Sequence, residues 1–152
     1  MKYVKVLLFV LHVVIGVGAL GGGYACIVEP MAPLGAPLSM LEGSPFGSFF
    51  IPGVVLFGLF GIGNIVGAVL LARRFKWHGY IAGVLGGGMV LWIVIQVLII
   101  KTIAFLHILF FFIGIVEASI GFAMLLQANM FPAPLLRRIV SRLFVPSQAG
   151  RG

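Results

Sequence analysis

The sequence contains four long runs of apolar residues with few charges inside them. By residue number these runs cover about 4–20, 51–72, 80–100 and 103–126. Each is long enough to cross a bilayer, because a transmembrane helix needs about 17–25 mostly apolar residues. Of the whole chain 62% is hydrophobic and only 9% charged, whereas a soluble domain has about 25% charged residues. This excludes soluble globular, disordered and collagen-like proteins. It predicts an all-α, four-helix transmembrane bundle in residues 1–131.

The first run also has some features of a signal peptide. Lys2 and Lys5 precede or begin the run, and three glycines and Cys26 follow it. However, the run is longer than the 7–15 or so apolar residues of a signal core, and Gly23 departs from a lipoprotein cleavage box. We therefore expect an uncleaved helix. Cys26 is the only cysteine, so neither an intrachain disulfide nor a cysteine-based metal site is expected.

The basic residues predict the orientation of the bundle. With the N-terminus in the cytoplasm, only Lys101 of the ten basic residues lies outside, as the positive-inside rule favours. Both termini are then cytoplasmic, and the protein is a multi-pass protein of the cell membrane. No nucleic-acid partner is expected, because the basic residues form short clusters between apolar runs and not one patch on a folded surface. The cytoplasmic basic residues are Lys2, Lys5, Arg73, Arg74, Lys76, Arg137, Arg138, Arg142 and Arg151.

The outer connection, residues 24–50, is rich in both proline and large apolar residues. Ser39 could cap a short turn that ends at Gly43, and Ser44 followed by Pro45 is typical of a helix N-cap and first helical position. We expect a set of short turns lying on the bundle. Two interpretations stay open, a packed connector and the roof of a binding cavity.

A group of motifs, which covers mainly the second and third spans, resembles a known set of proteins. The motifs are Ser44-Pro45-Phe46, Phe49 and Ile51-Pro52-Gly53, followed by a glycine-rich span and by Trp92 and Gln96. They are similar to small four-span prokaryotic integral membrane proteins that have no assigned activity. The resemblance implies a four-span architecture and transfers no function.

The C-terminal segment, residues 132–152, has an amphipathic pattern. Apolar residues recur at helical spacing from Leu135 to Phe144, and Arg137, Arg138 and Arg142 fall on the other face. The pattern predicts a cationic helix lying in an anionic inner leaflet, where the three arginines contact lipid headgroups. The alternative is a partly disordered tail.

Six of the polar side chains within the spans are candidates for a functional role, because such groups are unfavourable there unless they have a partner or a function. The depth of each residue in the membrane follows from a rise of about 1.5 Å per residue. One layer at a common depth contains Glu117 and two possible partners, His12 and Asn64, and we expect Glu117 to point into the bundle. A second layer lies nearer the outside. Either layer could be structural, or it could bind a ligand or carry a proton. The first layer is His12, Asn64 and Glu117, and the second is Trp92, Gln96 and His107.

Several glycines within the spans predict close helix packing. They have the small-xxx-small spacing that lets helix backbones approach one another. The pairs are Gly63 and Gly67 on the second span and Gly83 and Gly87 on the third, with Gly58 and Gly61 widening the smooth face of the second.

The familiar catalytic motifs are absent from the sequence. There is no aspartate, no CxxC pair, no HExxH or GxSxG motif and no phosphate-binding loop. We therefore expect no catalytic residue, cofactor or metal.

The sequence favours a non-enzymatic accessory or scaffold subunit that packs against another membrane protein or a second copy of itself. The alternative is a binder, carrier or membrane enzyme for a lipophilic or protonatable small molecule. A cavity lined by the polar residues would favour this alternative.

Overall fold

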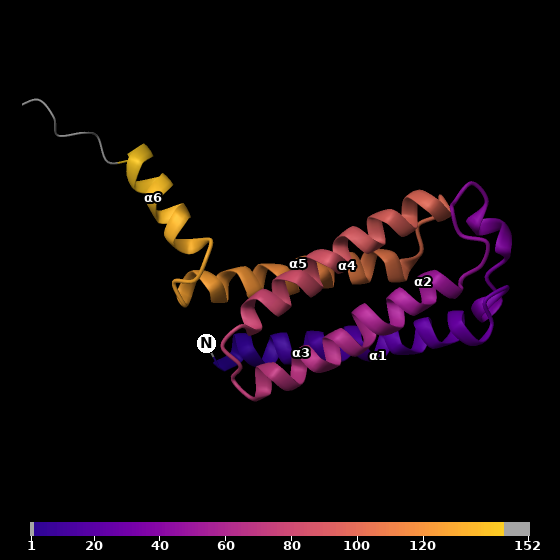
Figure 1. Cartoon of the computed structure of the whole chain (residues 1–152), viewed down its shortest axis with the longest axis horizontal. Helices are drawn as coiled ribbons and strands as arrows, with labels where there is room; N and C mark the ends of the chain where they lie inside the picture. Colours follow the sequence, from indigo (N-terminus) through magenta and orange to yellow (C-terminus); the bar gives the residue numbers. More distant parts are fainter. Residues whose placement is uncertain (1, 145–152) are drawn as a thin grey trace, which may run out of the picture.

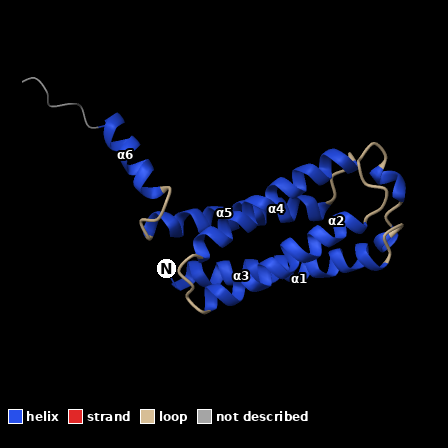
Figure 2. Ribbon diagram, in the orientation of Figure 1, coloured by secondary structure: helices blue, strands red, loops and turns tan. Residues whose placement is uncertain are grey.

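The computed structural model describes residues 2–144, with side chains as far as Ser141. All of its regular structure is helical, and no strand occurs within residues 2–144 (Figure 2). Four helical segments are long and apolar enough to cross a membrane, which confirms the predicted fold class and indicates a membrane protein. The elements are α1 (Lys2–Val28), η1 (Pro33–Gly35), η2 (Leu38–Leu41), α2 (Phe50–Val55), η3 (Leu56–Ile62), α3 (Gly63–Ala72), α4 (His78–Ile100), α5 (Phe105–Gln127) and α6 (Ala133–Phe144).

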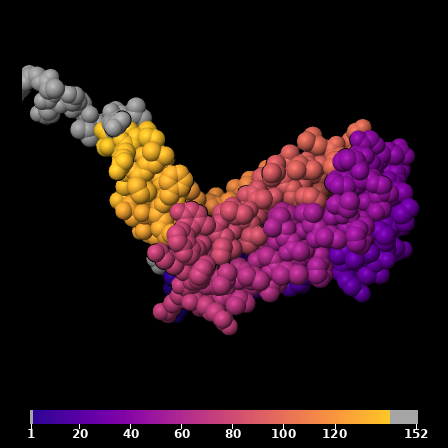
Figure 3. All heavy atoms as spheres, in the orientation of Figure 1, coloured from indigo at the N-terminus to yellow at the C-terminus, as the bar shows by residue number. Residues whose placement is uncertain are grey.

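The bundle consists of two antiparallel hairpins. In the first hairpin, α1 packs along a continuous span formed by α2, the π-helical segment η3, and α3. In the second, α4 packs along α5. The connection between α1 and α2 lies at one end, called here the loop end, and α6 projects from the other, called here the tail end (Figure 1). The space-filling view shows α6 projecting from the tail end of the bundle, with its base against the other helices (Figure 3).

Three of the helices end at a residue in the left-handed conformation. These residues are Arg74, Lys101 and Asn129, with φ between 53° and 56°. After α3 and α5 the chain also makes the wide backbone hydrogen bond of a Schellman motif, from Phe75 N to Leu70 O and from Met130 N to Leu125 O. This geometry satisfies carbonyls at the helix ends and turns the chain sharply towards the next element.

The last three spans agree with the predicted bounds to within two residues, but the first does not. We predicted that the first helix ends near residue 20, whereas α1 continues through the glycines to Val28. The reason is close packing against the next span. A Cβ at Gly23 would lie 2.5 Å from Phe57 N, and one at Gly53 would lie 2.5 Å from Cys26 Cβ. The glycines therefore act as packing positions within a helix and do not end it.

The connection at the loop end is consequently shorter than predicted, residues 29–49 instead of 24–50. Its two ends meet, because Phe49 N donates a hydrogen bond to Pro30 O over 2.9 Å. Ser39 lies inside η2 and is not its N-cap. Ser44 caps no helix either, since its hydroxyl accepts from Phe46 N at 3.2 Å and α2 begins only at Phe50. Both capping predictions were wrong, and the Ser44 hydroxyl instead pairs with the main chain of Phe46 in a local turn.

Glycine packing joins α4 to α5, and only part of it involves the glycines that were predicted. A Cβ at Gly86 would lie 2.5 Å from Ala118 N, and one at Gly121 would lie 2.6 Å from Gly83 N. By contrast, a Cβ at Gly58, Gly83 or Gly87 would meet no atom within 4 Å. Of the predicted pair, Gly83 has its backbone at the close contact with Gly121, whereas Gly87 is exposed and lies off the packing face. Gly86 lies on the face that meets α5.

The apolar core of the bundle forms two clusters at different depths. The cluster nearer the tail end comprises Leu8, Leu71, Ala82 and Met124. The cluster nearer the loop end comprises Ile15, Ala19, Phe60, Met89 and Ile93. On α1 the single buried polar residue His12 lies between Leu8 and Ile15, so the middle of the bundle is polar between two apolar sections.

Candidate functional site

Three polar side chains meet at the centre of the bundle. His12 comes from α1, Asn64 from α3 and Glu117 from α5, and their exposed fractions are 1%, 0% and 0%. As their depth predicts, Glu117 points into the bundle and not towards lipid. The cluster links the two hairpins, because His12 and Asn64 belong to the first hairpin and Glu117 to the second.

The His12 ring nitrogen Nδ1 is close to both of its neighbours. It lies 2.8 Å from Asn64 Oδ1, in hydrogen-bonding geometry, and 2.6 Å from Glu117 Oε1. The second contact has the distance but not the direction of a hydrogen bond. Both carboxyl oxygens of Glu117 are thus buried and without a hydrogen-bond partner among the described residues. Such a group is energetically unfavourable unless a charge or a proton compensates it.

The orientation of the Asn64 amide is fixed from its own helix. Its Nδ2 donates to the carbonyl oxygen of Phe60, one turn earlier, over 2.8 Å. Phe60 belongs to the π-helical segment η3, a kind of irregularity that is frequent at functional sites. With Nδ2 held by Phe60, the carbonyl oxygen of the amide is the atom that faces His12.

Two glycines make room for this cluster. A Cβ at Gly67 on α3 would lie 3.0 Å from Cε1 of the His12 ring, and one at Gly86 on α4 would lie 3.0 Å from Glu117 Cβ. The spacing of Gly63 and Gly67 predicted a packing face but gave Gly67 no link to His12. Its position three residues after Asn64, on the same helix face, was the available signal.

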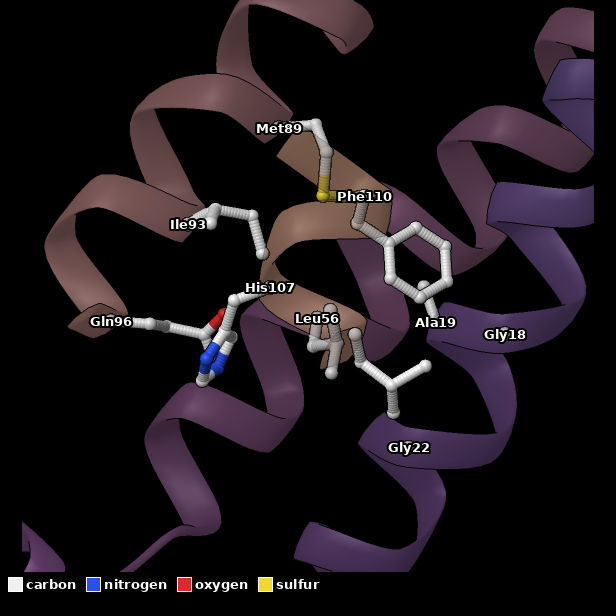
Figure 4. A pocket seen from close by; sticks show the side chains of 10 residues that line it. Gly18, Ala19, Gly22, Leu56, Met89, Ile93, Gln96, His107 and Phe110 are labelled. Carbon is white, nitrogen blue, oxygen red and sulfur yellow. The ribbon is translucent and has the colours of Figure 1, made fainter. Parts of the chain in front are cut away.

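The second predicted layer lies nearer the loop end and contains a cavity. Its volume is about 170 Å³, and both Gln96 of α4 and His107 of α5 line it. Figure 4 shows these two side chains beside one another, with apolar groups around the rest of the wall. The other lining residues are Gly18, Ala19, Gly22, Leu56, Met89, Ile93, Leu106 and Phe110.

The polar groups of the cavity keep free hydrogen-bonding capacity. His107 Nδ1 accepts from the backbone N–H of Ala104 at 3.1 Å. A neutral His107 ring therefore carries its proton on Nε2 and can donate it to a ligand. The Gln96 amide forms no side-chain hydrogen bond within residues 2–141, so it can offer both donors and an acceptor.

Trp92 does not line this cavity, although we predicted all three residues in one layer. It lies 6.0 Å from Phe60, ring centre to ring centre, and its buried Nε1 has no hydrogen-bond partner among the described side and main chains. With Gln96 it lines a separate space of about 30 Å³ beneath Leu41, Phe46 and Phe49. The connection therefore covers this small space, whereas none of its residues lines the larger cavity.

The predicted lipid-contact residues lie on α6. Arg137 and Arg138 are exposed there, and so are four apolar residues, Leu135, Leu136, Ile139 and Val140. The Arg142 side chain and the whole of Arg151 lie outside the described residues. As for metals, no group of three or more His, Cys, Asp or Glu side chains within the described part of the chain could hold an ion.

Together these features define a four-helix bundle of membrane type, with a closed polar centre and a polar-ended cavity nearer one end. No known protein family matches the chain. No curated protein matches it either, and no solved structure does.

Proposed function

We propose that the protein is an integral membrane protein that binds a small lipophilic molecule in the cavity between α1, α4 and α5. One observation carries this proposal: Gln96 and His107, on different helices, face the same apolar cavity with unused hydrogen-bonding groups. Most binding sites for small molecules have this composition, apolar walls with a few polar groups that fix orientation.

The size and chemistry of the cavity define the ligand class. An apolar cavity of roughly 150 Å³ can hold a benzene molecule, so this one has room for a ring or the end of a chain. The His107 Nε2–H and the Gln96 amide favour a ligand whose apolar body carries an oxygen acceptor, such as a carbonyl or hydroxyl group. Glu117 does not line the cavity, so this proposal gives it no role in ligand binding.

The proposed placement in the membrane follows the distribution of basic residues. With both termini in the cytoplasm, the cavity lies in the outer half of the bilayer. The apolar side of α6 enters the inner leaflet, and Arg137, Arg138 and Arg142 contact anionic headgroups there. The projection of α6 away from the bundle supports this arrangement (Figure 1).

A second candidate function is that of an accessory or scaffold subunit, and the outward face of α4 favours it. A Cβ at Gly83 or Gly87 would meet no atom within 4 Å, and Val84, Leu91 and Leu98 nearby are more than 60% exposed. A helix of another membrane protein, or a second copy of the chain, could pack closely on such a surface. In that case the purified protein should retain a partner chain and no small molecule.

Two glycine variants test the binding proposal. Gly22→Leu places a side chain in the cavity, whereas the matched control Gly21→Leu adds one where no atom lies within 4 Å. Each full-length protein is labelled in nanodiscs with a photoreactive diazirine alkyl ketone, and the labelled peptides are mapped by mass spectrometry. We expect labelling at α4 and α5 residues of the cavity in the unmodified protein and in Gly21→Leu, and its loss in Gly22→Leu. Equal labelling of all three proteins contradicts the proposal.

A further inference from the structure

We infer that His12 and Glu117 form a proton-transfer pair at the centre of the bundle, with the shared proton on His12. The pair is a site for a proton and is separate from the cavity between α1, α4 and α5. The proton transfer forms an N–H bond at His12 Nδ1 and breaks the O–H bond at Glu117 Oε1. The electron pair of that O–H bond stays on oxygen. The result is an imidazolium and a carboxylate whose charges sum to zero.

The distances identify the proton as the group that occupies this site. His12 Nδ1 is 2.8 Å from Asn64 Oδ1 and 2.6 Å from Glu117 Oε1. The His12–Asn64 separation is that of a hydrogen bond, and the His12–Glu117 separation is that of a close contact between two groups that can form an ion pair. No group of three or more His, Cys, Asp or Glu side chains that could hold a metal ion occurs here or elsewhere within the described residues.

Asn64 determines which atom keeps the proton. Because its Nδ2 donates to Phe60 O, its Oδ1 faces His12 as an acceptor and requires a hydrogen on Nδ1. If the proton stayed on Glu117 Oε1 and pointed at the ring, the ring would have to be the Nε2–H tautomer, and its bare Nδ1 would face the lone pairs of Asn64 Oδ1 at 2.8 Å. If the Oε1 hydroxyl pointed away from the ring, it would have no acceptor among the described residues. If the proton sat on Glu117 Oε2, that buried hydroxyl would have no acceptor among the described residues. Transfer to His12 avoids all of these arrangements.

The surroundings place no other charge against the pair. α3 contributes the Asn64 amide and Gly67, over which the ring edge of His12 lies, and η3 contributes the carbonyl of Phe60. α4 contributes Gly86, which has no side chain. In this apolar setting, opposite charges 2.6 Å apart attract strongly, and the zero net charge avoids placing an isolated ion in the membrane.

The composition of the chain makes the proton directly observable. The only acidic side chains are Glu29, Glu42 and Glu117, and the first two are exposed at the loop end. A Glu29→Gln/Glu42→Gln variant therefore leaves Glu117 as the only carboxyl side chain, and the C-terminal carboxyl is common to all variants. Infrared spectroscopy of this full-length protein in nanodiscs near neutral pH distinguishes a carboxylate from a carboxylic acid by its C=O stretch.

We expect no carboxylic-acid band from Glu117 in that background. Adding Asn64→Leu should return the proton to Glu117 and produce the band, and His12→Phe should produce it as well. Gln96→Leu, which removes an amide elsewhere in the membrane, should produce none. A carboxylic-acid band in the background protein that Glu117→Gln removes would overturn the inference. That comparison does not depend on whether the Asn64 or His12 variants fold.

Discussion

Gly67 lies directly under the imidazole of His12. A Cβ at this position would be 3.0 Å from the ring Cε1 and 3.2 Å from both ring nitrogens. Gly67 thus supports the polar centre of the bundle through its lack of a side chain, which leaves space for the His12 ring. Since the His12 ring is 1% exposed, it has little room to move aside.

A leucine at position 67 should therefore destabilise the bundle. Its side chain would occupy the space of the His12 ring and break the contact of the ring with Asn64. Overpacking of this kind costs about 1–3 kcal/mol. The measurement is unfolding in mild detergent, and the matched control is Gly58→Leu in the same span, where no atom lies within 4 Å. Equal stability of the two variants would show that Gly67 does not support the ring.

Replacing one glycine of α4 by alanine should change the stability of the bundle by an amount that depends on which of two adjacent glycines, Gly86 or Gly87, is replaced. At Gly86 the added Cβ would lie 2.5 Å from Ala118 N and 2.6 Å from Gly114 O, so the backbones of α4 and α5 must move apart. At Gly87 it would meet nothing within 4 Å. We expect Gly86→Ala to lose about 1–3 kcal/mol of unfolding free energy and Gly87→Ala to stay near the unmodified protein. Similar losses in both variants would contradict the packing of the second hairpin.

The helices could be predicted because an apolar run is a local property of the sequence. The depth of each polar residue could be predicted because the rise per residue of a helix is fixed. Depth alone brought His12, Asn64 and Glu117 to one level, and the structure joins them. What could not be predicted is helix rotation. Gly86 and Gly87 are equivalent in sequence, and only the position of α5 distinguishes them. The continuation of α1 through Gly23 likewise depends on the neighbouring span. Phe57 of that span lies so close to α1 that only a residue without a side chain fits at position 23. The functional roles of the polar residues stay predictions.

The orientation with both termini in the cytoplasm is testable with single cysteines. Cys26 is first replaced by serine, and cysteines are then introduced at Glu42, Lys76 or Arg137. Glu42 lies in the connection at the loop end and Lys76 in the turn before α4, so the two are at opposite ends of the bundle. We expect a membrane-impermeant maleimide to label position 42 in intact cells, and positions 76 and 137 only after the membrane is opened. Labelling of positions 42 and 76 from the same side would contradict the four-span topology.

The tail helix should respond to the charge of the lipid. Leu136 and Val140 are on the exposed apolar side of α6, and Arg137 and Arg138 lie among them in sequence. A fluorophore attached to a cysteine at position 136, in the Cys26→Ser background, should be quenched by brominated acyl chains in nanodiscs that contain anionic lipid. Replacing Arg137, Arg138 and Arg142 by glutamine removes about 1 kcal/mol of attraction per basic residue, so the quenching should fall. In nanodiscs of neutral lipid the unmodified protein and this variant should give the same lower quenching. If the unmodified tail is quenched equally in neutral and anionic nanodiscs, apolar burial alone holds α6 at the membrane and the three arginines do not.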